Sequence, residues 1–169
     1  MNRELEDTFL SGLEENKQQL LRICSAYAKD TEDRNDLFQD VLASIWKSMP
    51  SFKGNSSIST WMYRVTLNVC LNAQTKLTKK KKQFVPLDSV TLSRYQGEDS
   101  TEEEPPLLLH LRSCIKEMDG ADKTITMLYL EELPYKEIAD ITGISENHVA
   151  VKIKRIKKKL LTCINKKSC

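Results

Sequence analysis

The feature that most restricts the fold is a pair of short segments near the C-terminus in which apolar residues have helical spacing, separated by a short turn that contains one glycine. The first segment covers residues 135–142. In the second, apolar residues recur at i, i+4, i+7 and i+11, on one stripe of a helix: Val149, Ile153, Ile156 and Leu160. Gly143 suits a tight turn with positive φ, and Ser145 can cap the second helix. The segment therefore predicts a helix-turn-helix.

The rest of the chain has the composition of an α-helical protein. Its 169 residues include only 5 Gly and 5 Pro, and few are aromatic, which favours helices over a β-sandwich. Helical spacing marks residues 16–29, 35–48, 59–79, 107–118 and 123–132. In the third of these helices, we expect the buried stripe to consist of Trp61, Val65 and Val69. The sequence predicts an all-α fold.

One segment interrupts the helical pattern and divides the chain. Residues 83–105 have no sustained period, and they contain two prolines, a glycine and an acidic run. We expect a flexible linker there. It would join two small helical domains, an N-terminal helical bundle at residues 1–82 and a C-terminal helix-turn-helix domain at residues 106–169.

Charge is segregated along the chain, although the net charge is only +2. Residues 41–87 hold eight bases and no acid, and residues 147–169 hold another eight bases and no acid. Two separate basic blocks indicate two contacts on one polyanion. Two solvated helix faces are the alternative, but such faces usually mix the two signs of charge.

The second helix of the predicted helix-turn-helix is apolar on one side and basic on the other. We expect the side opposite its apolar stripe to present Asn147, His148, Lys152, Arg155 and Lys159. Such a helix fits the major groove of DNA, where the first side chains reach base edges and the later cations hold phosphates. An ordinary helical hairpin with a solvated lysine face is the alternative.

No pattern in the sequence indicates a metal, a cofactor or catalysis. The five cysteines are an odd number and mostly far apart, so we expect neither a disulfide framework nor a zinc site, and a reduced, cytoplasmic protein. No apolar run is long enough for direct membrane insertion, and from the acidic residues at the N-terminus we expect no signal peptide. A small enzyme has no motif to support it.

Two blocks of the sequence resemble bacterial RNA polymerase sigma factors of the small extracytoplasmic-function type. The first block, similar to the family's second conserved region, reads DLFQDVLASIWKSMPSFKGNSSISTWMYRVTLNVCLN. The second is the helix-turn-helix block, similar to the fourth region. The resemblance implies a non-enzymatic protein that binds core RNA polymerase, directs it to promoter DNA and helps to open the duplex.

The resemblance also assigns roles to residues of the first block. It implies that the polymerase is bound by Asp36, Leu37, Gln39 and Asp40. It implies that a base flipped out of the −10 element is held by Phe52, Lys53, Gly54, Asn55, Ser56 and Asn68. An extruded base needs an apolar wall, exposed backbone groups and an amide that reads its edge, which these residue types supply. Trp61 is interpreted as core, not as an aromatic that melts DNA.

In the second block, the resemblance implies that the recognition helix reads the −35 element. Many relatives have a basic residue and a serine where this chain has Ala150 and Val151, so the base preference does not carry over. The family also implies an anti-sigma factor as a partner. Two other functions stay open at this point: a helix-turn-helix regulator that binds duplex DNA without polymerase, and a helical adaptor with incidental basic faces.

Overall fold

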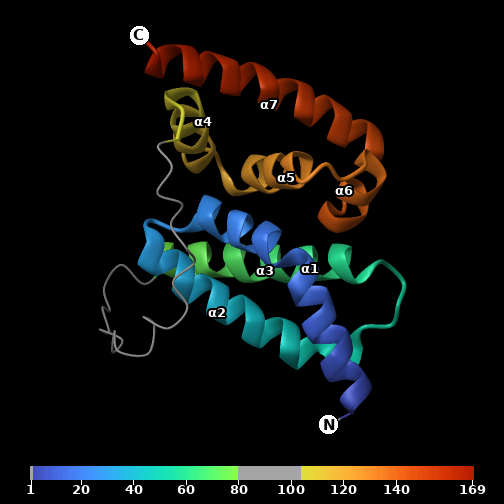
Figure 1. The fold of residues 1–169 in the computed structure, drawn as a ribbon. Helices are drawn as coiled ribbons and strands as arrows, with labels where there is room; N and C mark the ends of the chain where they lie inside the picture. The colour runs from blue at the N-terminus through green and yellow to red at the C-terminus, as the bar shows by residue number, and fades with distance from the viewer. Residues whose placement is uncertain (1, 80–103) are drawn as a thin grey trace. The chain divides into compact units, whose positions relative to one another are not determined.

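The computed structural model describes residues 2–79 and 104–169 and divides the chain into two compact units, Met1–Asp99 and Ser100–Cys169. Within the described residues every regular element is a helix, which confirms the all-α prediction (Figure 1). Nearly all of the predicted linker, and the lysines at 80–82, lie outside those residues. None of the helices that the structure describes has the length and apolar character to cross a membrane.

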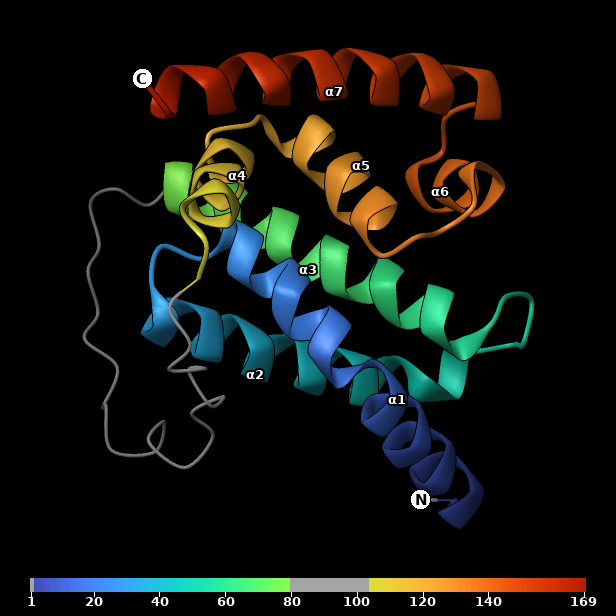
Figure 2. The same cartoon turned by 45° about the horizontal axis from the view of Figure 1, so that its top comes forward.

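The first unit is a bundle of three helices, α1 (Arg3–Tyr27), α2 (Thr31–Ser48) and α3 (Ile58–Lys79), with a short 3₁₀ turn, η1 (Met49–Ser51), after α2. Each of the three helices packs against the other two (Figures 1 and 2). Asp30 caps α2, because the Asp33 N–H donates to Asp30 Oδ1 at 2.8 Å. Fully buried apolar side chains from all three helices form the core: Leu20, Ile23, Val41, Ile45 and Met62.

The helix predicted to start at residue 16 starts at Arg3. Asn2 caps this longer α1, since the Glu4 N–H donates to Asn2 Oδ1 at 3.2 Å. The N-terminal half of α1 is held to α2 by an edge-on contact of the Phe9 and Trp46 rings, with centroids 5.1 Å apart. This half of α1 also packs on α3 through the buried Gly12, which lies close to the Met62 and Ile58 side chains. Because these contacts form no continuous apolar stripe, the predicted boundary was wrong.

The buried side of α3 also differs from the prediction. Its buried residues are Thr60, Met62, Tyr63, Thr66, Leu67 and Cys70, and the predicted stripe residues Trp61, Val65 and Val69 are only half-buried. A shift of one residue turns a helix by about 100°. The buried stripe includes polar residues, which hydropathy alone would place at the surface. Hydrogen bonds allow their burial: the Thr66 hydroxyl donates to the Met62 carbonyl at 2.8 Å, and the Tyr63 hydroxyl donates to Asn16 Oδ1 at 3.2 Å.

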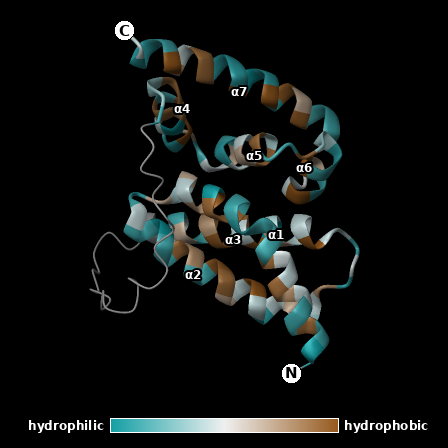
Figure 3. Cartoon of the chain, in the orientation of Figure 1, coloured by the Kyte–Doolittle hydropathy of each residue, from teal (hydrophilic) through white to brown (hydrophobic). Residues whose placement is uncertain are grey.

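The second unit contains α4 (Pro106–Lys116), α5 (Gly120–Leu130), α6 (Tyr135–Thr142) and α7 (Glu146–Lys167). The long helix α7 packs on the other three, with α6 near its N-terminal end and α4 near its C-terminal end (Figure 2). Hydropathy alternates along α7 as in an amphipathic helix (Figure 3). Val149, Ile153 and Ile156 are buried, so the predicted stripe is confirmed apart from Leu160, which is half-buried.

The turn between α6 and α7 has the predicted geometry. Gly143 ends α6 with φ of +76°, a conformation that costs glycine nothing and other residues a steric penalty. Its N–H donates to the Ala139 carbonyl at 2.9 Å. Ser145 caps α7 by accepting a 3.1 Å hydrogen bond from the His148 N–H. The structure thus confirms a helix-turn-helix made of α6 and α7.

One cysteine pair contradicts the expectation of a chain without disulfides. Cys114 of α4 and Cys163 of α7 form a disulfide, with their Cα atoms 6.0 Å apart and a sequence separation of 49. Cys24 and Cys70 are buried thiols, and Cys169 is an exposed one. The pairing results from the packing of α4 on α7, which sequence spacing alone does not indicate.

Candidate nucleic-acid and protein interfaces

An acidic stripe, defined as Glu32, Asp36 and Asp40, runs along α2 at i, i+4 spacing. Like charges at this spacing repel one another and cost helix stability. Partial burial, followed by the neighbouring carboxylates, of which Glu32 contributes most, raises the pKa of Asp36. The helix dipole favours acids in the first turn, but Asp40 lies beyond its reach. The stripe is therefore a surface suited to a positively charged partner.

The four predicted polymerase-binding residues do not all lie on the surface. Asp40 is exposed, and Asp36 and Gln39 are partly exposed. Leu37 is only 7% exposed and belongs to the core, so it positions α2 and is not available for direct contact. Sequence reasoning missed Glu32, although its spacing of four residues from Asp36 was a visible signal.

The loop between η1 and α3 is exposed at its tip and anchored at both ends. Lys53, Gly54, Asn55 and Ser56 are all exposed, and Gly54 has φ of +75° with open space for 4 Å around the position that a Cβ would take. The Phe52 N–H donates to the Met49 carbonyl at 3.1 Å. At the other end, Ser57 Oγ accepts from the Thr60 N–H at 3.1 Å.

An aromatic contact joins this loop to the outward face of α3. The rings of Phe52 and Trp61 are tilted against each other with centroids 5.3 Å apart. Trp61, predicted to be core, is half-buried and lies seven residues before the exposed Asn68, on the side of α3 opposite the buried Cys70. The structure therefore brings together the predicted loop and the helix that carries Asn68.

One further residue of this face was missed at the sequence level. Asn72 is exposed and lies four residues after Asn68, so both side-chain amides lie on the same side of α3. The half-buried Val65 lies between Trp61 and the two amides. Apolar groups flanked by amides can stack on a nucleobase and read its edge.

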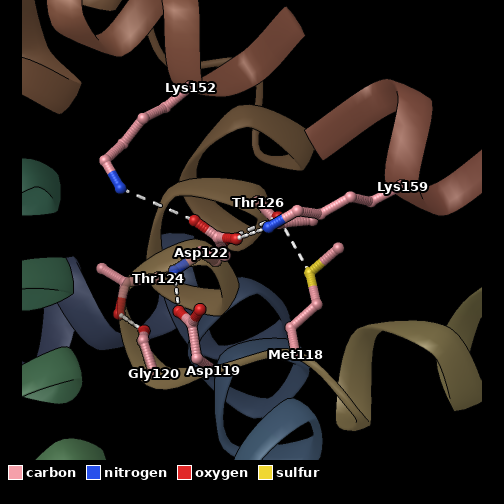
Figure 4. Close-up of polar contacts among 8 residues, drawn as sticks. All are labelled: Met118, Asp119, Gly120, Asp122, Thr124, Thr126, Lys152 and Lys159. Atoms are coloured by element: carbon pink, nitrogen blue, oxygen red, sulfur yellow. Dashed lines mark hydrogen bonds and ion pairs between the residues drawn. The ribbon is translucent and has the colours of Figure 1, made fainter. Parts of the chain in front are cut away.

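The bases of α7 fall into two groups. Four of them contact the body of the second unit. Lys159 Nζ lies 2.9 Å from Asp122 Oδ2, and Lys152 Nζ lies 3.7 Å from Asp122 Oδ1 (Figure 4). Lys157 Nζ lies 4.9 Å from the centroid of the Tyr129 ring, and Lys167 Nζ lies 2.8 Å from Glu117 Oε1. These contacts hold α7 to α4 and α5.

The outward face of α7 is consequently different from the predicted one. Lys152 and Lys159 turn toward α5, because that helix flanks the buried stripe on their side. His148 is exposed. We define the outward face by the exposed residues that lie opposite the buried stripe: Asn147, Val151, Lys154, Arg155 and Lys158. Lys154 and Lys158 were missed, although the spacing from Asn147 through Val151 is i, i+4, i+7, i+11.

Comparisons with known proteins match both units. The family profile Sigma-70 region 2 matches residues 13–80, and Sigma-70, region 4 matches residues 109–160. The chain is 25% identical over 142 residues to RNA polymerase sigma factor SigV of Bacillus subtilis (strain 168). This alignment covers 83% of this chain and 81% of that protein.

At least two solved structures share the fold. One is the sigma factor RpoE in complex with the anti-sigma factor NepR from Bartonella quintana, with a TM-score of 0.68, 14% identity, and coverage of 97% of this chain and 98% of that one. A second is CnrH in complex with the cytosolic domain of CnrY, with a TM-score of 0.67, 17% identity, and coverage of 95% and 89%.

Proposed function

The chain belongs to the sigma-70 family of RNA polymerase sigma factors, in the extracytoplasmic-function group. We propose a separate role for each of its two units in transcription initiation. As a sigma factor, the protein binds core RNA polymerase and directs promoter-specific transcription initiation. The observation that carries the function is the match of two family regions, in order, to two separate helical units.

The acidic stripe of α2 docks on a basic surface of the polymerase. Asp36 and Asp40, with Gln39 beside them, present carboxylates and an amide on a helix that is fixed by buried neighbours such as Leu37 and Phe38. Charges arranged in this way set the rate and the register of association more than the raw affinity. The repulsion along the stripe is relieved when a cationic partner approaches, which favours the complex over the free protein.

The loop from Phe52 to Ser56 and the outward face of α3 capture an unstacked base of the −10 element. The Phe52–Trp61 pair offers an aromatic wall, Gly54 exposes backbone groups, and Asn68 offers an amide. Opening the duplex costs roughly 1.4 kcal/mol per base-pair step in lost stacking. Stacking a captured base on an aromatic side chain recovers about 1–3 kcal/mol. Lys53 and Asn55 are exposed beside this wall and can reach the phosphate backbone.

The helix α7 reads the −35 element. Asn147 and His148 lie in its first turn, from which recognition helices contact base edges, and Arg155 follows two turns later. Val151 is exposed and apolar, so it suits a thymine methyl group. Lys154 and Lys158 join Arg155 as phosphate contacts on the outward face.

The protein acts in the cytoplasm, where core polymerase works, and it carries out no enzymatic reaction. The two solved structures described above are complexes, one with the anti-sigma factor NepR and the other with the cytosolic domain of CnrY. We expect an anti-sigma factor to hold this chain in the same way. Such a partner competes with the polymerase, so its release starts transcription.

Gel filtration with purified core polymerase tests the function. The full chain is expected to co-elute with the core enzyme and to support transcription from a library of promoter templates. A helix-turn-helix regulator that works without polymerase would bind duplex DNA but would neither co-elute nor start transcription. Failure to co-elute would refute the sigma-factor function.

A further inference from the structure

One carboxylate in the second unit engages two bases of the proposed DNA-binding helix. Asp122 lies in the first turn of α5, opposite α7, and its side chain is only 11% exposed (Figure 4). Its N–H donates to Asp119 Oδ1 at 2.8 Å, and its carbonyl accepts from the Thr126 hydroxyl at 2.7 Å. The backbone of Asp122 is therefore held in place before any contact with α7 is considered.

Both oxygens of this carboxylate are used. Oδ2 accepts from Lys159 Nζ at 2.9 Å, and Oδ1 lies 3.7 Å from Lys152 Nζ. The two lysines are seven positions apart, about 10 Å along the helix axis, so Asp122 bridges two turns of α7. The hydrogen bond to Asp122 raises the pKa of Lys159.

The bases on the outward face have a different environment. None of the ion pairs found in residues 104–169 involves Lys154, Arg155 or Lys158, and all three are exposed. The basic charge of α7 is thus divided into cations that face outward and cations that face an internal acid. The Lys159 side chain is 64% exposed although Asp122 is not, so solvent screens this ion pair and stability alone is a weak explanation for the arrangement.

We propose, on the basis of the proposed function, that Asp122 is a positioning residue that withholds Lys152 and Lys159 from DNA phosphates. Contacts with phosphate raise affinity for every sequence alike, whereas contacts with base edges discriminate between sequences. An internal carboxylate competes with phosphate for these lysines at a high effective concentration. Asp122 therefore lowers sequence-independent binding and leaves recognition to the outward face.

The salt dependence of DNA binding measures how many cations reach phosphates. Each neutralised phosphate contributes about 0.9 to the slope of log K against log salt. We would measure the binding of the full chain to a short duplex of random sequence by fluorescence anisotropy. Asp122→Asn is expected to steepen the slope by up to about 1.8, because it frees two lysines.

Two matched variants complete the comparison. Lys154→Gln with Lys158→Gln is expected to flatten the slope by about 1.8, because both bases face outward. Adding Lys152→Gln and Lys159→Gln to Asp122→Asn is expected to restore the wild-type slope. The proposal is overturned if Asp122→Asn leaves the slope unchanged. It is also overturned if the variant with all three changes, at Asp122, Lys152 and Lys159, flattens the slope as much as the double variant at Lys154 and Lys158 does.

A second measurement does not depend on DNA. Only a neutral amine reacts with an acylating reagent, so Lys159 is expected to react more slowly than Lys158 in the wild type and at a similar rate in Asp122→Asn. Mass spectrometry of the modified full chain gives both rates, and circular dichroism verifies that the variant is folded. Equal rates in the wild type would overturn the proposal, whereas failure to bind polymerase would refute the proposed function and leave these rates unaffected.

Discussion

Replacing Asp36 by Asn should stabilise the first unit and weaken its binding to polymerase. Asp36 lies at the centre of the acidic stripe, four residues from Glu32 on one side and from Asp40 on the other. The substitution keeps the size of the side chain and removes one charge from both repelling pairs. If the acidic stripe serves binding and lowers stability, its loss should raise the stability of the first unit and weaken the complex with polymerase.

The expected gain can be worked out from the two pairs. A like-charge pair at i, i+4 destabilises a helix by about 0.2–0.5 kcal/mol, so Asp36→Asn should add about 0.4–1 kcal/mol at neutral pH. In a unit of this size, such a change raises the thermal midpoint by about 2–8 °C. Asp40→Asn removes only the pair with Asp36 in this stripe and serves as the comparison, with about half the gain.

The gain should also depend on pH, with a defined sign. Burial and neighbouring carboxylates raise the pKa of Asp36 in the folded protein. The folded state therefore binds this proton more tightly than the unfolded state, and the penalty of Asp36 is present above its folded pKa and absent below its unfolded pKa of about 3.9. The stability advantage of Asp36→Asn should be full at pH 7 and disappear as the pH falls below about 4.

Thermal melts of the full chain at several pH values, and titration of labelled core polymerase, give the two readouts. The expected result is a higher midpoint for the first unit together with a weaker complex. A lower midpoint at pH 7, or a gain of equal size at pH 7 and pH 4, would refute the electrostatic account of the stripe. Unchanged polymerase binding would show that the stripe does not form the docking surface.

Three other predictions concern single features. Without reduction, alkylation of the unfolded chain should modify three of its five cysteines, because the other two form the disulfide. Replacing Cys114 and Cys163 by Ser opens a loop of 49 residues and should lower the free energy of unfolding of the second unit by up to about 4 kcal/mol in a denaturant titration. Gly143→Ala should cost about 1–2 kcal/mol in the same titration, because φ is +76° there. Asn68→Ala should slow promoter opening, followed by permanganate reactivity, more than it weakens closed-complex formation, and equal losses would argue against the base pocket.

The features predicted well from the sequence are those set by neighbouring residues. A glycine with positive φ and a serine cap depend on two or three residues around them, and both occur at the predicted positions Gly143 and Ser145. The helix between residues 135 and 142 has the predicted bounds. The composition, poor in Gly and Pro, was sufficient to indicate an all-α fold.

The predictions that failed concern the direction in which a helix faces. For α3 the true stripe includes Thr66 and Tyr63, whose polar groups are satisfied by hydrogen bonds that no local pattern shows. For α7 the apolar stripe was predicted correctly apart from Leu160, but no local pattern showed that Lys152 and Lys159 lie close to an acid on a different helix. A helical period gives the spacing of a stripe, but its orientation depends on which helices pack beside it.

Local sequence was enough to indicate which segments are helical, where the helix-turn-helix bends and which stretches are basic, because short-range sterics, capping and apolar spacing are local properties. Three contacts became visible only in the folded chain: the Cys114–Cys163 disulfide, the Phe52–Trp61 ring contact and the ion pairs of Asp122 with two lysines of α7. These contacts join residues from different elements of the chain, and their partners are selected when whole helices pack to bury their apolar sides.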